Sequence, residues 1–239
     1  ADALGADHVH VVLMPSRYSS DHSVVDAEEL ATNLGIGTLT VPIESAHTAL
    51  GSVLVSSIAG TLTTVADENL QARIRGVMLM SLANTFDWLV LTTGNKSEAA
   101  VGYSTLYGDT VGAYAPIKDV YKTVVYELVR WRNERDGAPV VPVSIVEKAP
   151  SAELRPNQRD DDSLPRYEVL DPLLEAYIEG DRTRVELVSD GFDAGLVEEV
   201  VRLVDRAEFK RRQNPPGVRV TQKGFGRDRR LPLVNRYWG

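Results

Sequence analysis

The residues best suited to chemistry lie between residues 91 and 122, in a run that begins apolar and becomes polar. The run reads L-T-T-G-N-K-S-E-A-A-V-G-Y-S-T-L-Y-G-D-T-V-G-A-Y-A-P-I-K-D-V-Y-K. Residues 87–93 are short, β-branched and apolar, which predicts a buried parallel strand that ends at Gly94. The polar stretch from Gly94 to Gly112 holds four glycines, hydroxyls, tyrosines and charges of both signs, and offers little for a core. Because ligands of open α/β sheets bind beyond the carboxyl ends of strands, this run predicts a site for an anionic ligand.

The elements that must position this run begin with a β-α-β pattern. Residues 8–14 predict a strand, and residues 38–43 predict the next one. Between them, Ser23 followed by Asp26 resembles a capping box for a helix that ends near Gly35. This order favours a parallel, twisted sheet flanked by helices, with right-handed crossovers. Residues 1–4 look like the last turn of a helix, which predicts a segment upstream of this sequence.

Apolar residues at helical spacing predict two further helices. Asp67 is a candidate cap for the first, whose predicted buried stripe is Leu70, Ile74, Val77, Met78 and Leu82. Asn69 and Arg73 lie one turn apart on a different face of this helix. The second helix follows the polar run, with a predicted stripe of Val120, Val124, Leu128 and Trp131. Residues 44–65 are also predicted to be helical, and residues 171–178 and 194–211 predict helices near the end of the chain.

The composition limits the class of protein. The chain has 239 residues, 43% of them hydrophobic, which is enough for one substantial domain. A net charge of −8 disfavours nonspecific binding to nucleic acid or to a membrane surface. The sequence contains no cysteine, which excludes thiolate chemistry and is typical of cytoplasmic proteins. No histidine spacing suggests a metal site, and residues 147–167, rich in proline and acid, predict a mobile lid loop.

Several motifs together resemble one enzyme family. G-N-K-S-E, G-Y-S-T-L-Y-G-D and P-I-K-D-V-Y-K in the polar run resemble the synthetase domain of bacterial glutamine-dependent NAD synthetases, which are ATP pyrophosphatases. Four other stretches agree in order and spacing: M-P-S-R-Y-S-S-D-H-S, E-N-L-Q-A-R-I-R-G, P-S-A-E-L-R-P-N-Q and E-F-K-R-R-Q-N-P-P-G. G-N-K-S-E alone would be weak evidence, but the ordered motifs extend through most of the chain.

The resemblance implies a fold and a reaction. The fold would be α/β and Rossmann-like, of the adenine-nucleotide alpha-hydrolase type. In the reaction, ATP adenylylates the nicotinate carboxylate of deamido-NAD, pyrophosphate leaves, and ammonia displaces AMP to give NAD. The protein needs no nucleophile, but it must neutralise the charge of the two anions, for which Mg²⁺ and cationic side chains are suited. The resemblance also implies a cytoplasmic homodimer or larger homo-oligomer, with the apolar helix over residues 68–85 as a candidate interface.

The resemblance also assigns roles to individual residues. It implies that Thr93, Lys122 and Ser151 bind ATP. It implies that deamido-NAD is bound by Asn69, Arg73, Glu98, Tyr103 and Lys210. Glu98 is in addition the expected Mg²⁺ ligand, because its hard oxygen suits that ion. Taken singly, each residue has a plainer explanation, such as a helix-start glutamate for Glu98 or a helix-end lysine for Lys210.

The sequence departs from the family pattern in two ways. An S-G-G-x-D-S phosphate-binding loop is expected between the first strand and the first helix, and it does not occur here. A glutaminase domain is also not in this sequence, so ammonia would come from solution or from another part of the polypeptide. Residues 1–239 are therefore predicted to be a single NAD synthetase domain missing its first strand and phosphate loop. Two alternatives stay open: a fragment that binds nucleotide or dimerises without activity, and another amide-forming ATP pyrophosphatase.

Overall fold

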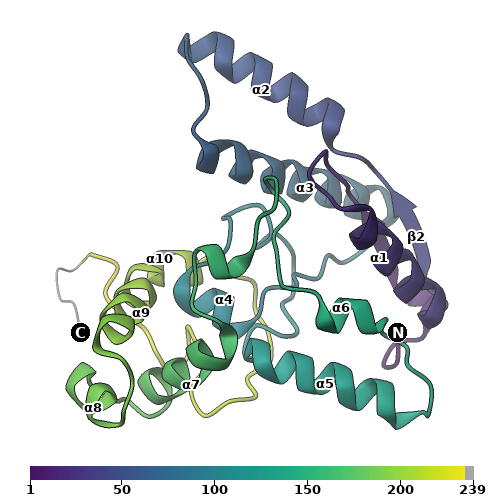
Figure 1. The fold of residues 1–239 in the computed structure, drawn as a ribbon. Helices are drawn as coiled ribbons and strands as arrows, with labels where there is room; N and C mark the ends of the chain where they lie inside the picture. Colours follow the sequence, from purple (N-terminus) through teal and green to yellow (C-terminus); the bar gives the residue numbers. More distant parts are fainter. Residues whose placement is uncertain (235–239) are drawn as a thin grey trace. The chain divides into compact units, whose positions relative to one another are not determined.

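The computed structural model describes residues 1–234, which fall into two compact units (Figure 1). The first unit comprises Ala1–Leu79 and Tyr126–Leu164. The second unit comprises Met80–Val125 and the described residues from 165 to 234. Two of the boundaries between the units fall within helices α3 (Thr64–Phe86) and α5 (Lys122–Arg135), and the two units are described in turn.

The first unit is built on a β-α-β element. Strands β1 (His10–Leu13) and β2 (Gly37–Thr40) pair in parallel, with His10 opposite Gly37, after a short 3-10 helix, Ala6–His8. Helix α1 (Asp21–Leu34) connects the two strands and ends at Gly35, in the left-handed conformation (φ 66°) that favours glycine. The prediction of parallel strands joined by a helix is confirmed, and with it the α/β class. The cap at Ser23 is wrong, because the Ser20 side chain accepts the Ser23 N–H and α1 begins two residues earlier.

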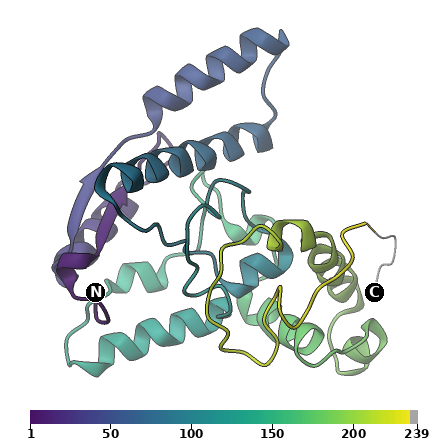
Figure 2. The same ribbon diagram turned by 180° about the vertical axis from the view of Figure 1, so that it is seen from behind.

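Helix α2 (Glu44–Ile58) is an exposed apolar arm of the first unit, and Figures 1 and 2 both show it extending away from the two strands. Its exposed side chains include Leu50, Val53, Leu54, Val55 and Ile58. Residues 45–66 contain no Asp, Glu, Lys or Arg. Helix α3 (Thr64–Phe86) follows, and Val77, predicted to lie in its buried stripe, is 68% exposed. Among residues 1–234, no helix combines the length and the hydropathy that crossing a membrane requires.

The remaining elements of the first unit leave apolar side chains uncovered. Helix α5 (Lys122–Arg135) contributes its residues from Tyr126 onward, and α6 (Val143–Glu147) and the 3-10 helix Asp160–Asp162 follow. Of the predicted buried stripe, Val120 is buried, but the prediction is wrong on α5 itself, since Leu128 is 48% and Trp131 57% exposed. Residues 148–159 contain no helix or strand. Spacing alone identifies one apolar face of a helix, but it does not show whether another part of the protein covers that face.

The second unit has a closed helical core. It contains α4 (Lys96–Val101), α7 (Tyr167–Ile178), α8 (Arg184–Ser189), α9 (Ala194–Arg206) and α10 (Glu208–Arg211). Helix α4 packs against both α7 and α9, and α8 packs against α9. The fully buried side chains of this core include Leu170, Leu173, Leu174, Ile178, Leu187, Val197, Val200, Val201 and Val204. This core fixes α4, which carries the G-N-K-S-E motif.

The chain before α4 is extended but does not form the predicted strand. Over residues 87–93 there is one parallel bridge, between Leu91 and Tyr114. Next to it, the Thr92 N–H donates to the Tyr114 carbonyl oxygen and the Ala113 N–H donates to the Val90 carbonyl oxygen. Leu89 is 63% and Leu91 50% exposed, so the prediction of a buried strand is wrong. Gly112 (φ 151°) permits the close pairing, because a Cβ there would lie 2.8 Å from the Thr92 Cγ2 and 2.9 Å from the Val90 carbonyl oxygen.

Candidate functional site

The G-N-K-S-E motif starts helix α4 with a capping box. The Asn95 side chain accepts the Glu98 N–H at 3.0 Å, and the Glu98 carboxylate accepts the Asn95 N–H at 3.1 Å. Asn, x, x and Glu are the residues this motif requires, because the two side chains satisfy each other's backbone donors. Asn95, Lys96 and Ser97 are buried, whereas the Glu98 side chain keeps 20% of its surface exposed. The cap uses only one of the two Glu98 carboxylate oxygens. Glu98 can therefore cap its helix and still use the other oxygen for the predicted Mg²⁺.

Glu98 and Lys122 lie next to each other. The Lys122 Nζ is 3.3 Å from the Glu98 Oε1, and each side chain is 20% exposed. The Lys122 Nζ also lies 5.5 Å from the centre of the Tyr167 ring. The pair therefore combines an accessible hard carboxylate with an accessible ammonium, which suits a ligand that brings both phosphate and a divalent cation.

Asp171 of α7 fixes the start of α5 relative to α4. Its Oδ1 accepts the Ser97 hydroxyl at 2.5 Å, and its Oδ2 accepts the Thr123 N–H at 2.9 Å and the Thr123 hydroxyl at 2.8 Å. Ser97 Oγ in turn accepts the Lys122 N–H at 2.9 Å. Asp171 and Ser97 are both buried, so these bonds are shielded from water. Sequence reasoning missed Asp171, which no recognised motif contains.

Lys210 holds the loop that carries Tyr103. Its Nζ donates to the Gly102 and Ser104 carbonyl oxygens, at 2.7 Å each. Gly102 ends α4 in the left-handed conformation (φ 73°), and a Cβ there would lie 2.8 Å from the Ala207 Cβ. Lys210 therefore fixes the carbonyls on both sides of Tyr103, a contact that spacing alone did not predict. Tyr103 itself is half-buried.

Asp109 belongs to the same loop and was not among the predicted site residues. Its two carboxylate oxygens accept the Thr105 N–H at 2.9 Å. Asp109 as a residue is exposed, but desolvation of its carboxyl group within the loop raises the pKa of that group to about 6. The negative charge of Glu98 also raises this pKa, whereas the hydrogen bond from the Thr105 N–H lowers it. The G-D pair in G-Y-S-T-L-Y-G-D was the available signal. Thr93, which was predicted, is exposed at the end of the extended segment.

In the first unit, the E-N-L-Q-A-R stretch of α3 supports the segment of residues 147–167. Gln71 is fully buried and its Nε2 donates to the Leu154 carbonyl oxygen at 2.9 Å. One turn before it, Glu68 forms an ion pair with Arg155 at 3.2 Å. The predicted residues Asn69 and Arg73 lie on either side of Gln71 in sequence, Asn69 half-buried and Arg73 exposed.

Ser151 lies beside a second cluster of the first unit, which forms at the start of α1. Ser151 Oγ accepts the Glu153 N–H at 3.1 Å. The Glu153 carboxylate accepts the Ser20 N–H at 3.2 Å and the Ser23 hydroxyl at 2.6 Å, and it pairs with Lys148 at 2.9 Å. Desolvation acts to raise the pKa of Glu153, but the hydrogen bonds from Ser23, Lys148 and Ser20 together lower it below its usual value.

A carboxylate therefore occupies the N-terminus of α1, where backbone N–H groups and the helix dipole favour an anion. Sequence reasoning found Ser151 but not Glu153, although both stand in P-S-A-E-L. The signal was the acid two residues after the serine.

The predicted site residues thus fall into two sets. The second unit brings together Glu98 and Lys122, and it brings Lys210 to the Tyr103 loop. The first unit holds Asn69, Arg73 and Ser151. Within residues 1–234 no three His, Cys, Asp or Glu side chains form a cluster that could hold a metal ion. Glu98 alone fits Mg²⁺ only when a ligand supplies further oxygens, which is how this ion is commonly held beside phosphates.

Comparison with known proteins finds one family. The family model for NAD synthase matches residues 1–214. The glutamine-dependent NAD(+) synthetase of Rhodobacter capsulatus is 50% identical over 99% of the chain and 44% of its own length, and that of Thermotoga maritima is 49% identical over 99% and 41%. The chain thus spans less than half the length of these curated relatives.

Solved structures give the same result. The glutamine-dependent NAD+ synthetase of Acinetobacter baumannii, in complex with ADP, is 45% identical with a TM-score of 0.61, over 98% of this chain and 42% of its own. The synthetase of Cytophaga hutchinsonii, at 22% identity and a TM-score of 0.78, covers 95% of this chain and 38% of its own and shows the fold alone.

Proposed function

The chain belongs to the NAD synthase family, and we propose that the polypeptide containing it forms NAD from deamido-NAD, ATP and ammonia. The observation that carries this proposal is the pairing of Glu98 with Lys122 at 3.3 Å, at the start of two helices that a buried network holds together. A relative 45% identical to this chain has a structure in complex with ADP, which supports a nucleotide as one ligand.

Charge neutralisation is the task of this pair. The nicotinate carboxylate must approach the α-phosphate of ATP, form an acyl-adenylate and release pyrophosphate. Lys122 supplies a compact positive charge for the phosphates. Glu98 would hold Mg²⁺, which when bound neutralises phosphate charge and polarises the reacting phosphoryl group. The Lys122 ammonium and the Asn95 cap keep the Glu98 carboxylate oriented until the nucleotide binds.

The remaining predicted residues keep their proposed roles. Tyr103, Lys210, Asn69 and Arg73 are proposed to bind deamido-NAD. For Lys210 the role includes holding the Tyr103 loop, given its bonds to Gly102 and Ser104. Thr93 and Ser151 are proposed to bind ATP.

The segment of residues 147–167 is proposed as a lid. Residues 148–159 lack helix and strand, which is compatible with a closing loop. The segment is anchored by Glu153 at the start of α1 and by the Leu154 carbonyl at Gln71. Closure over ATP would exclude water from the hydrolysable acyl-adenylate.

A further strand and a phosphate loop are proposed to come from elsewhere in the polypeptide. All four residues of β2 are exposed, although parallel strands are normally buried on both faces. Trp131 and Leu128 of α5 are exposed in the same unit. Both observations favour cover by chain outside this sequence, consistent with relatives more than twice as long. Ammonia would come from solution or from a glutaminase domain in the same polypeptide.

A homodimer is also proposed, with α2 as its main interface element. The arm exposes Leu50, Val53 and Ile58, and after Glu44 it carries no Asp, Glu, Lys or Arg. Clustered exposed apolar side chains of this kind often mark a surface that contacts another protein. The sequence pointed to residues 68–85 instead, and exposed Val77 of α3 is compatible with a contribution from that helix as well.

The decisive experiment measures NAD formed from deamido-NAD, Mg-ATP and ammonium. It compares this chain with a chain extended upstream by the residues of the natural polypeptide. We expect only the extended chain to be active, because it would supply the phosphate loop. If neither chain forms NAD, the proposed substrate is wrong; if the short chain binds deamido-NAD but no ATP, it is the inactive binding fragment.

A further inference from the structure

Lys96, the middle residue of G-N-K-S-E, is fully buried and makes four polar contacts in the second unit. Its Nζ lies 3.0 Å from Asp119 Oδ1, 3.1 Å from Glu179 Oε1 and 2.9 Å from the Lys223 carbonyl oxygen, and it also donates to the Thr221 hydroxyl. The Tyr121 ring covers it at 4.9 Å. Lysine is almost never fully buried without partners, so this arrangement demands an explanation beyond core filling.

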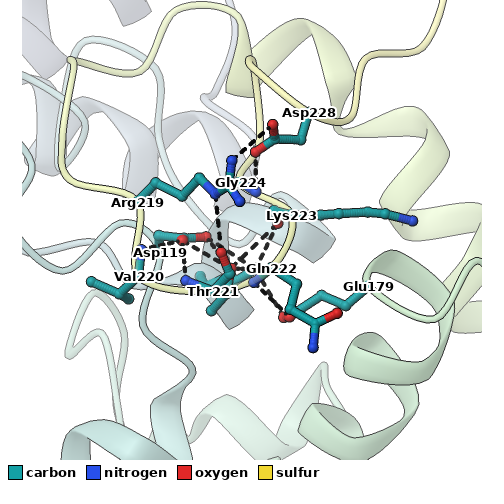
Figure 3. Close-up of polar contacts among 10 residues, drawn as sticks. Asp119, Glu179, Arg219, Val220, Thr221, Gln222, Lys223, Gly224 and Asp228 are labelled. Carbon is teal, nitrogen blue, oxygen red and sulfur yellow. Dashed lines mark hydrogen bonds and ion pairs between the residues drawn. The ribbon is translucent and has the colours of Figure 1, made fainter.

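The partners of Lys96 include an irregular segment near the end of the chain, residues 215–225, here termed the strap. Figure 3 shows that the Asp119 carboxylate accepts hydrogen bonds from the strap. The N–H groups of Val220 and Thr221 donate to it at 2.8 and 2.9 Å, and the Thr221 hydroxyl donates to it at 2.8 Å. The Gln222 N–H donates to Glu179 at 3.1 Å. These bonds, rather than any helix or strand, determine the path of the strap.

The other end of the strap holds the loop before α5. The Ala115 N–H donates to the Pro216 carbonyl oxygen at 2.8 Å, and Lys118 Nζ donates to the Pro215 carbonyl oxygen at 2.6 Å. At Gly217 a Cβ would lie 2.2 Å from the Ala115 carbonyl oxygen, so only glycine permits this approach. The strap therefore lies directly against residues 115–119.

Glu98 and Lys122 each lie close in sequence to one member of the ion pair of Lys96 with Asp119. Glu98 is two residues after Lys96 on α4, and Lys122 is three residues after Asp119. The Lys96 N–H also donates to the Val120 carbonyl oxygen at 2.9 Å. The buried Lys96 contacts thus fix one side of the Glu98 and Lys122 pair, while Asp171 and Ser97 fix the other.

We propose that Lys96 is a positioning residue, which uses its buried contacts with Asp119 and with Thr221 of the strap to set the geometry of Glu98 and Lys122 for Mg-ATP. The proposal deepens the proposed function and rests on it. An apolar side chain of similar volume often replaces a buried ion pair at no loss of stability. Retention of a charge here is therefore better explained by the geometry it imposes than by stability.

Thr221→Val tests the proposal more gently than removal of the buried charge. Valine keeps the shape and leaves the pair of Lys96 with Asp119 intact, but it removes the hydroxyl that joins both groups to the strap. In the natural polypeptide we expect the dissociation constant for Mg-ATP, measured by titration calorimetry, to rise about tenfold, the equivalent of ~1.4 kcal/mol. Thr221→Ser restores the hydroxyl and should restore most of the affinity.

A double-mutant cycle separates positioning from stability. If Thr221 acts through Lys122, Thr221→Val should weaken Mg-ATP binding less than about twofold in a Lys122→Met background, because the two effects share one path. Thr183→Val is the matched control: it removes a helix-capping threonine from α8 in the same unit, and it should lower the melting temperature without changing Mg-ATP affinity. Asp119→Asn provides a second test if Thr221→Val does not fold.

Two outcomes overturn the proposal while leaving the proposed function intact. One is unchanged Mg-ATP affinity in folded Thr221→Val; the other is an equal loss of affinity in both Lys122 backgrounds. Failure of the proposed function itself is seen first, in the unmodified polypeptide, as no Mg-ATP binding and no NAD formation.

Discussion

The two units of this chain bury their apolar residues to very different degrees. In the second unit, α7 and α9 meet in a core whose leucines and valines are fully buried. In the first unit, β2 is exposed along its length and α2 presents Leu50 and Val53 to solvent. Both units contain helices that carry several large apolar side chains. The difference is in how far the apolar faces are covered within each unit.

The largest effect is expected in the second unit, where the closed core holds the proposed site. Glu98→Gln should lower the rate of NAD formation by the natural polypeptide about 100-fold or more, the scale for loss of a charged group that acts in the transition state. Glutamine still satisfies a capping box, so the fold should be kept. Steady-state kinetics at saturating Mg-ATP measures the change.

Glu186→Gln is the matched control for that substitution. Glu186 closes the capping box of α8 with Thr183 in the same unit, far along the chain from G-N-K-S-E. Its activity should equal that of the unmodified protein. Equal losses in Glu98→Gln and Glu186→Gln would mean that Glu98 only caps its helix.

Removal of one leucine from each unit tests the comparison directly. Leu174→Ala in the core of the second unit should lower the free energy of unfolding by about 2–5 kcal/mol, because it leaves a cavity. Leu50→Ala on the exposed face of α2 should change it by less than about 0.5 kcal/mol at concentrations where the chain is monomeric. Urea unfolding monitored by circular dichroism gives both values, and similar losses would contradict the contrast between the units.

Association should in turn depend on the first unit. Val53→Asp places a charge on the arm and should raise the dissociation constant of the proposed homodimer at least about tenfold, since a buried unpaired charge is costly. Light scattering at micromolar concentration would then report the 26.2 kDa chain rather than twice that mass. Val185→Asp, at an exposed position of α8 in the second unit, is the control and should not change the mass. A monomeric unmodified chain would rule out the dimer.

The sequence predicted what depends on local rules and on motif order. The β-α-β order follows from alternating apolar runs and turn residues, and the Gly35 cap follows from the left-handed conformation that glycine tolerates. The family followed from ordered motifs, of which G-N-K-S-E carried Glu98. The sequence could not predict which apolar faces are covered, and so it placed Val77, Leu128 and Trp131 in a core from which they are exposed.

The arrangement of the candidate site could be predicted only in part, for a related reason. Spacing and motifs found Glu98 and Lys122, but the groups that hold them come from distant parts of the chain. Asp171 and Thr221 contact the site region through hydrogen bonds that span 74 and 125 residues of sequence. No local pattern encodes such contacts, because they depend on how the core of the second unit packs. For the same reason Lys210 was predicted as a ligand contact and not as the group that holds the Tyr103 loop.

The smallest effects are expected when the pH is changed. The resulting change in the free energy of unfolding should have opposite signs for one carboxyl group in each unit. Glu153 in the first unit has a pKa below its ordinary 4.5, so it stabilises the folded chain above that pH and loses this contribution as the pH falls through its folded pKa. Asp109 in the second unit has a pKa raised from 3.8 to about 6. Its unfolded form releases the proton first, so the free energy of unfolding falls as the pH rises from about 4 to about 6.

Substitution of either carboxyl group should remove its contribution to the pH dependence of the free energy of unfolding. Glu153→Gln should be less stable than the unmodified chain at neutral pH. The difference should shrink as the pH falls below about 4.5, because the unfolded chain then takes up a proton that the folded chain still lacks. Asp109→Asn should instead gain stability relative to the unmodified chain as the pH rises from about 4 to about 6, and the difference should then stay constant. Urea unfolding at intervals of one pH unit measures both curves. Parallel curves for Asp109→Asn and the unmodified chain would show that Asp109 ionises normally. The difference in pH dependence between the units would then rest on Glu153 alone. Glu153 has Lys148 and Ser23 as partners, whereas Asp109 has, among the described residues, only the Thr105 N–H and more distant charges.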